Sequence, residues 1–180
     1  MPNYHRIYGG KAYYFTVVTY HRLPILVCEA ARKILHNAWE IVEKRFPFTT
    51  IAICLLPEHI HAIWSLPEDD QNYSIRWKEI KRQFTKRYLV EVSSGEERNE
   101  SRQKRGEAAI WQRRFWEHTI VNEEDLARHV DYIHYNPVKH GFVERVGEWK
   151  WSSFHRYVQA GYYDPDWGKA RESWGYGAFG

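Results

Sequence analysis

The chain has 180 residues, and its 26 Lys and Arg against 23 Asp and Glu give a formal net charge of only +3. A chain of this length fits one domain whose core is large enough to be stable without disulfides or metal ions. The two cysteines, Cys28 and Cys54, do not form a CxxC metal-binding pair. The first residues are polar, and the longest apolar run, residues 51–56, is too short to cross a bilayer, so we expect a cytoplasmic protein without membrane contact.

The first half of the chain predicts strands around one helix. Residues 12–20 are β-branched and aromatic with partial alternation, which predicts a strand. Apolar side chains recur at helical spacing over residues 29–45, which predicts an amphipathic helix that ends before Pro47. Two strand-like runs, residues 49–56 and 59–66, follow with only Pro57 and Glu58 between them, which predicts a hairpin or a tightly connected pair.

The middle of the chain is basic. Ser74 predicts the start of a second helix that runs to about Val90. Residues 76–114 carry twelve Lys or Arg and six Asp or Glu, so the rest of the chain is net acidic. Residues 93–107 have no large apolar side chain, which predicts a flexible insertion at about 92–109. Residues 110–120 predict a further strand whose aromatic rings are interleaved with arginines.

The last part of the chain predicts one more long helix. Asn122 is a good N-cap, and acidic residues occupy the first turn, where the helix dipole favours them. We expect this helix to end by Pro137, which biases Asn136 out of the helical region. An aromatic-rich C-terminal extension from about residue 147 holds at most one short helix, around residues 152–160, so residues 1–180 are expected to form one domain.

Two histidines and one helical stripe can carry chemistry. His59 and His61 lie two positions apart on a predicted strand, so both imidazoles point to one face and can share a metal ion. An isolated pair of this kind is more often a pair of hydrogen-bonded strand histidines. On the helix after Asn122, the residues Asp125, His129, Tyr132 and Asn136 form a polar stripe about a quarter turn from the apolar one. Most such stripes are solvated, but solubility does not require a tyrosine.

These groups suit one reaction class. An activated tyrosine oxygen can attack a phosphodiester and form a phosphotyrosine, while a metal held by the histidines and Asn136 polarises a phosphate oxygen. The amide oxygen favours Mg²⁺ or Mn²⁺, although two imidazoles also accept Zn²⁺. Tyr135 is the competing nucleophile, but it lies on another side of the helical wheel, away from Asn136.

At these residues the sequence resembles the single-tyrosine HUH transposases, and within them the REP-associated tyrosine transposases. The matching segments are residues 56–67 (LPEHIHAIWSLP), 76–85 (RWKEIKRQFT), 111–120 (WQRRFWEHTI), 129–141 (HVDYIHYNPVKHG) and 151–157 (WSSFHRY). Together they cover nearly the whole chain, except for the insertion and the last few residues.

The resemblance implies an α+β fold, a ferredoxin-like palm with a central antiparallel sheet. It implies cleavage and rejoining of single-stranded DNA beside hairpin-forming, REP-like palindromes through a 5′-phosphotyrosine, with a divalent metal, Mg²⁺ or Mn²⁺. It makes His59, His61 and Asn136 the metal ligands and Tyr132 the nucleophile. Glu58, Asp125 and His129 are candidates to support these residues, and His118, Lys139 and His140 are surface residues that can touch phosphate.

The basic segment is the candidate DNA surface, and we expect it to lie beside the active site as a basic field. Its candidate contacts are Arg76, Lys78, Lys81, Arg82, Lys86, Arg87, Arg113 and Arg114. Trp77, Trp111 and Trp116 are candidate stacking platforms for unpaired bases, whereas Phe84 and Phe115 are expected in the core.

Two other functions stay open at this point. The first is a regulator that binds hairpin DNA without cutting it, which intact His59, His61, Tyr132 and Asn136 argue against. The second is a zinc hydrolase that uses the histidine pair and a water, which leaves the tyrosine and the basic segment unexplained. The expected assembly is a monomer or a homodimer, and DNA binding implies a nucleoid-associated protein.

Overall fold

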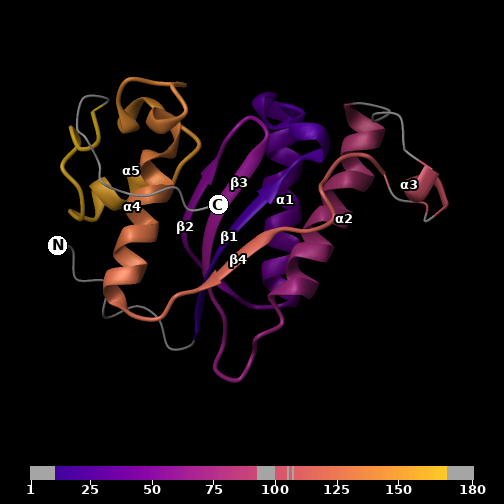
Figure 1. Cartoon of the computed structure of the whole chain (residues 1–180), viewed down its shortest axis with the longest axis horizontal. Helices are drawn as coiled ribbons and strands as arrows, with labels where there is room; N and C mark the ends of the chain where they lie inside the picture. The colour runs from indigo at the N-terminus through magenta and orange to yellow at the C-terminus, as the bar shows by residue number, and fades with distance from the viewer. Residues whose placement is uncertain (1–10, 93–99, 105, 107, 170–180) are drawn as a thin grey trace.

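A computed structural model describes residues 11–92, 100–104, 106 and 108–169 of the chain. Four strands form one antiparallel sheet in the order β2-β3-β1-β4. Helices α1 (Glu29–Arg45) and α2 (Tyr73–Glu91) cover one face, and α4 (Glu123–Lys139) covers the other (Figure 1). The expected α+β fold with a central antiparallel sheet is confirmed.

The sheet is built around a hairpin and one central strand. β2 (Thr49–Leu55) and β3 (His59–Ser65) pair antiparallel across the short predicted connection. β1 (Ala12–Val18) pairs with β3 so that Thr16 lies opposite His61. β4 (Trp116–Thr119) pairs with the other edge of β1. This pairing places the two histidines in the interior of the sheet.

The strand predicted over residues 110–120 is shorter than expected. Only Trp116–Thr119 is a strand, and Trp111 contributes an isolated bridge to Thr19. The ring of Trp111 is buried against Phe84, with 5.0 Å between the ring centroids. Its side chain therefore anchors the chain to the core before the chain reaches the sheet.

The face under α1 and α2 holds an aromatic core. The rings of Trp64 and Trp77 stack with centroids 4.3 Å apart, and Trp39 meets both edge-on. Trp77 and Trp111 are buried in this core, so the prediction that they stack on bases is wrong. Phe84 lies in the core as expected, and Trp116 stays 40% exposed.

Two helix ends differ from the sequence prediction. α2 begins at Tyr73 rather than at Ser74, because the Asn72 side chain accepts the hydrogen bond from the Ile75 backbone amide. α4 is capped by Asn122 as predicted, but it continues through Pro137 to Lys139. The proline lacks one backbone donor, but the helical hydrogen bonds resume after it, since His140 N–H donates to Asn136 O.

The remaining elements are short. They are the 3₁₀ turns Tyr20–Arg22, Ile25–Val27 and Val146–Glu148, and the helices α3 (Glu100–Lys104) and α5 (Phe154–Gln159). α5 matches the short helix predicted around residues 152–160. α3 lies within the predicted insertion, whose residues 93–99, 105 and 107 are outside the described residues. None of the described helices is long and apolar enough to cross a membrane.

Candidate active site

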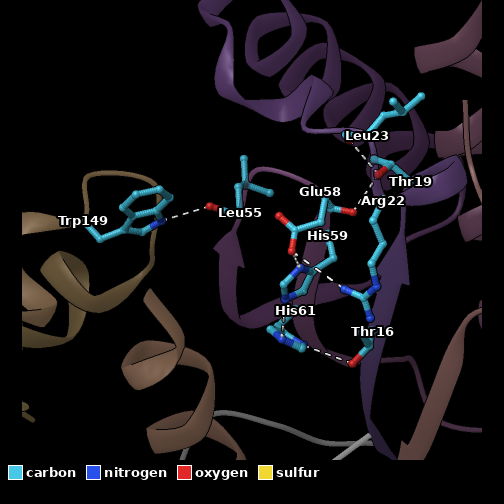
Figure 2. A network of polar contacts seen from close by, with 9 residues as sticks. All are labelled: Thr16, Thr19, Arg22, Leu23, Leu55, Glu58, His59, His61 and Trp149. Carbon is cyan, nitrogen blue, oxygen red and sulfur yellow. Dashed lines mark hydrogen bonds and ion pairs between the residues drawn. The ribbon is translucent and has the colours of Figure 1, made fainter. Parts of the chain in front are cut away.

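The two histidines of β3 converge on one point. Strand alternation sends His59 and His61 to the same face, and both side chains are buried. Their Nε2 atoms lie 3.1 Å apart (Figure 2). A pair of nitrogens at this spacing can ligate a single metal ion.

The opposite nitrogen of each ring is held by a neighbour. His61 Nδ1 lies 2.7 Å from the Tyr14 hydroxyl and 3.1 Å from Thr16 Oγ1. His59 Nδ1 lies 3.0 Å from a carboxylate oxygen of Glu58, which also lies 3.8 Å from Arg22 (Figure 2). Partners of this kind fix the orientation and tautomer of a metal-binding histidine, leaving Nε2 for the ion.

Burial keeps both rings neutral. It lowers the pKa of His59 to about 4, although the Glu58 carboxylate opposes the shift. It also lowers the pKa of His61 well below 6.5, and the neighbouring His59 acts in the same direction. At neutral pH each imidazole therefore carries a lone pair that a metal ion can accept.

Tyr132 and Asn136 on α4 face these histidines. Both are buried, and the Tyr132 ring meets His61 edge-on with 5.5 Å between the centroids. The polar stripe therefore lies against the face of the sheet, over β1 and β3. Lys139 Nζ donates a hydrogen bond of 3.2 Å to the Tyr132 hydroxyl oxygen.

The residues present fit a divalent metal ion. Asn136 Nδ2 donates to the backbone carbonyl of Tyr132, but its buried Oδ1 has no hydrogen-bond partner among the described residues. A buried carbonyl oxygen without a partner costs free energy unless a ligand satisfies it. Together with two neutral imidazoles it forms an oxygen and nitrogen donor set that suits Mg²⁺, Mn²⁺ or Zn²⁺.

Tyr135, the competing tyrosine, lies away from the histidine pair. Its ring contacts Trp167, with 6.4 Å between the centroids, and lies against Gly168 in the C-terminal segment. The helical wheel placed it on a different side from Asn136, and the structure agrees.

A second cluster of candidate ligands lies on the other side of Tyr14 from His61 and packs on the Tyr14 ring. His118, Asp125 and His129 have ligand atoms within 4.8 Å of one another. Asp125 accepts hydrogen bonds from the Val121 amide at 3.0 Å and pairs with His118 Nε2 at 2.8 Å. Burial alone raises the pKa of Asp125, but these bonds and the charge of His129 more than offset that effect and leave it lowered.

This cluster braces the histidine pair. Its oxygens already bond within the cluster, and His129 Nδ1 also lies 2.8 Å from the Asp125 carbonyl oxygen. The His129 ring packs on Tyr14 at 4.8 Å, and Tyr14 in turn bonds His61. Glu58 contacts His59 directly, whereas Asp125 and His129 reach His61 only through Tyr14.

Arg76 is removed from the candidate DNA surface. It is 1% exposed, and its guanidinium pairs with Asp70 at 2.6 Å and donates to the carbonyls of Phe46, Pro47 and Asn72. Lys81 is half-buried and donates to Gln112 O. The other candidates are exposed, namely Lys78, Arg82, Lys86, Arg87, Arg113 and Arg114.

The basic helix does not lie beside the histidine pair, contrary to the sequence prediction. α2 packs on the face of the sheet opposite α4, so the sheet separates its cations from Tyr132 (Figure 1). Arg113 and Arg114 are not on α2 but lie shortly before β4, whose first residue, Trp116, pairs with Thr16 beside His61. The alternation of β1 explains the separation: Tyr13 and Phe15 face α2, and Tyr14 faces α4.

Sequence reasoning missed Tyr14 and Thr16 and undervalued Lys139 and His140. The contact of Tyr14 with His61 depends on the register of two strands far apart in the chain, which no local pattern reveals. Lys139 lies seven residues after Tyr132, which is a helical spacing, but the helix was expected to end earlier. His140 meets His59 edge-on, with 5.3 Å between the ring centroids.

Comparisons with known proteins point in one direction. No family model matches the chain. It is 42% identical over 168 residues to a REP-associated tyrosine transposase of Escherichia coli, covering 93% of this chain and 91% of the relative. It is 47% identical over 169 residues to a Haemophilus influenzae protein assigned to the same group, covering 93% and 94%. A solved REP-associated tyrosine transposase bound to a REP hairpin is 40% identical, with a TM-score of 0.72 and full coverage of both chains.

Proposed function

The chain belongs to the REP-associated tyrosine transposases, enzymes that cleave and rejoin DNA by transesterification, and we propose that it cuts single-stranded DNA beside REP-like hairpins with Tyr132 as its nucleophile. The observation that carries this proposal is the meeting of four side chains from two elements. His59 and His61 from β3 and Tyr132 and Asn136 from α4 are buried together in the described part of the chain.

The proposed reaction exchanges one phosphodiester for another. The Tyr132 oxygen attacks the scissile phosphorus, the bond to the 3′ oxygen breaks, and a 5′-phosphotyrosine and a free 3′-OH result. The phenolic proton is released to solvent, and the departing 3′ oxygen takes up a proton. The Lys139 ammonium, 3.2 Å from the tyrosine oxygen, stabilises negative charge that develops there. Attack of a 3′-OH on the phosphotyrosine reverses the step and rejoins DNA.

His59, His61 and Asn136 would hold the divalent metal, and we assign Mg²⁺ or Mn²⁺ as the ion. When bound, such an ion polarises a phosphate oxygen and orients the phosphodiester. The chain's own contribution is orientation: Tyr14 and Thr16 hold His61, and Glu58 holds His59. Asn136 is in turn anchored through its Nδ2 to the helix backbone.

We assign the duplex arm of the hairpin to the exposed cations on α2 and before β4. Lys81 bonds Gln112 O, which joins the α2 surface to Arg113 and Arg114. A single strand leaving this surface can pass the β4 edge to reach Tyr132 on the other face. Charge reversal by K81E and R82E should weaken hairpin binding and reduce its salt dependence by about one unit of slope per lost phosphate contact. Unchanged affinity and slope would reject this assignment.

The experiment that tests the function is a covalent capture assay. Labelled hairpin DNA with a single-stranded flank is incubated with the protein and Mn²⁺, and adducts are resolved on a denaturing gel. We expect an adduct that is absent in Y132F and retained in Y135F, which removes the hydroxyl of the competing tyrosine. Hairpin binding with no adduct in any protein would favour the DNA-binding regulator, and cleavage without an adduct would favour a hydrolase.

A further inference from the structure

A row of aromatic rings leads away from the histidine pair towards the β2 edge of the sheet. His140 lies 5.3 Å from His59, measured between ring centroids, and stacks on Phe142 at 5.9 Å. Phe142 stacks on Trp149 at 5.6 Å, and Trp149 meets Trp151 edge-on at 5.1 Å. Each ring is thus in reach of the next, and the first touches a proposed metal ligand.

The row is held firmly at the open edge of β2. Trp149 Nε1 donates to Leu55 O at 2.9 Å, as Figure 2 shows, and Leu55 N donates to Trp151 O at 2.8 Å. Cys54 and Ser152 form an isolated bridge at the same edge. The backbone that carries the two tryptophans is therefore fixed against the sheet, while Phe142 and Trp151 remain 41% and 39% exposed.

The far end of the row opens into a cavity of about 560 Å³. Trp151 lines it together with Arg32, Arg156, Glu40 and Glu43. The Arg32 guanidinium lies over the Trp151 ring, 3.4 Å from its centroid. The arginines of this cavity donate hydrogen bonds and its carboxylates accept them. The edge of a nucleobase offers both acceptors and donors, whereas a phosphate offers only acceptors and would be repelled by the carboxylates, so the cavity suits a base better than a phosphate.

We propose that residues His140, Phe142, Trp149 and Trp151, with the cavity beyond them, bind the bases of the single-stranded segment next to the scissile phosphate. Proteins bind unpaired bases by stacking them on aromatic side chains, because every base has a π-face. The position agrees with the assigned path of the DNA: the duplex lies towards β4, the reacting phosphate lies at Tyr132, and the single strand continues over the β2 side. This inference rests on the proposed function.

The test measures binding, so that it does not depend on cleavage. In the Y132F background, the affinity of labelled hairpins is compared with and without a single-stranded extension of about eight nucleotides, on either side. We expect W151L and F142L each to weaken binding of one extended hairpin about 10-fold and to leave the bare hairpin unchanged. W151F and F142Y keep a ring and should restore most of the affinity.

An abasic site moved along the extension identifies the partner base. Where the missing base is the one that stacks on Trp151, W151L should cost no further affinity, because the contact is already absent. Equal losses for extended and bare hairpins, no loss in the leucine variants, or losses independent of the abasic position would each overturn the proposal. No loss in either leucine variant is the result expected if the row were a protein-docking surface. If the Y132F proteins show the expected binding pattern while the chain with Tyr132 intact forms no adduct, the result would contradict the proposed cleavage and not this site.

Discussion

The Tyr14 hydroxyl is the residue-scale feature that most directly links packing to chemistry. It is buried on the catalytic face of β1 and lies 2.7 Å from His61 Nδ1. Burial raises its pKa well above 10, so the phenol stays protonated and can share its proton with the imidazole or accept from it. The residue therefore positions a proposed metal ligand without touching the reacting atoms.

We expect Y14F to lower the affinity for Mn²⁺ about 10-fold, because loss of such an outer hydrogen bond typically weakens metal binding 10-fold to 100-fold and Thr16 still contacts the same nitrogen. Isothermal titration calorimetry with Mn²⁺ measures the change. Y13F is the matched control, because Tyr13 faces the opposite core of the sheet. Equal Mn²⁺ affinities for Y14F and the unmodified chain would show that Tyr14 does not hold His61.

At the scale of elements, α2 is tied to the body by a buried cation. Arg76 joins α2 to the end of α1 through the carbonyls of Phe46 and Pro47, and Asp70 neutralises it. We expect R76L to lower the free energy of unfolding by about 3 kcal/mol, because the two carbonyls and the Asp70 carboxylate would lose their hydrogen-bond donor. Urea unfolding measures this. K78L, two residues further on the exposed side, should change stability by less than about 0.5 kcal/mol. A stable R76L protein with weakened hairpin binding would return Arg76 to the DNA surface.

α4 is tied to α5 and β2 by a buried neutral histidine. His134 is fully buried, its Nε2 lies 2.8 Å from Ser153 Oγ, and that hydroxyl also contacts the backbone of Ile53 in β2. Burial lowers the pKa of His134 to about 3 from its ordinary 6.5.

This histidine should make the fold sensitive to acid. Below pH 6.5 the side chain of His134 binds a proton in the unfolded chain but stays neutral in the folded chain. The contribution of His134 to the free energy of unfolding is therefore complete above pH 6.5 and declines as the pH falls towards 3. The decline is about 1.4 kcal/mol per pH unit. We expect H134Q to reduce the slope of unfolding free energy against pH by about that amount between pH 6 and 4, measured by urea unfolding. An unchanged slope in H134Q would contradict the account.

The elements show why sequence reasoning succeeded in part. α1 has the bounds its apolar spacing predicted, and the β2-β3 pair follows from a two-residue connection, because both signals are local. The end of α4 and the short β4 were missed because tertiary contacts decide them: Trp111 is drawn into the core, and α4 gains enough from packing to pass Pro137. Arg76 had the same local signature as its exposed neighbours, and only the position of Asp70 separates them.

At the scale of the whole molecule, the sheet separates the basic helix α2 from the histidine pair. The exposed cations of α2 lie on one face and the histidine pair with Tyr132 on the other (Figure 1), so the proposed duplex binding and the proposed cleavage would occupy separate layers. Helical spacing in the sequence predicted that Tyr132 and Asn136 share one face of a helix, and strand alternation predicted that His59 and His61 share one face of a strand. Only the fold shows that these two pairs meet and that the basic helix lies across the sheet from them.

Because the histidine pair and the basic helix lie on opposite faces of the sheet, we expect a metal ion to affect cleavage and not hairpin binding. A saturating concentration of Mn²⁺, about 100 times its Kd, should stabilise the fold by about 2.7 kcal/mol, seen as a rise in Tm, while EDTA should stop cleavage and leave hairpin binding intact. The rise should disappear in H61A. It should persist in H118A, which removes a ligand atom from the second cluster. Loss of the rise in H118A with its retention in H61A would move the metal to His118, Asp125 and His129.

The central claim is that Tyr132 forms the covalent bond to DNA. The most direct measurement digests the captured adduct with protease and nuclease and locates the remaining nucleotide on a peptide by tandem mass spectrometry. The account predicts a nucleotide attached through its 5′ phosphate to Tyr132. A nucleotide on Tyr135, or on any other residue, would contradict it.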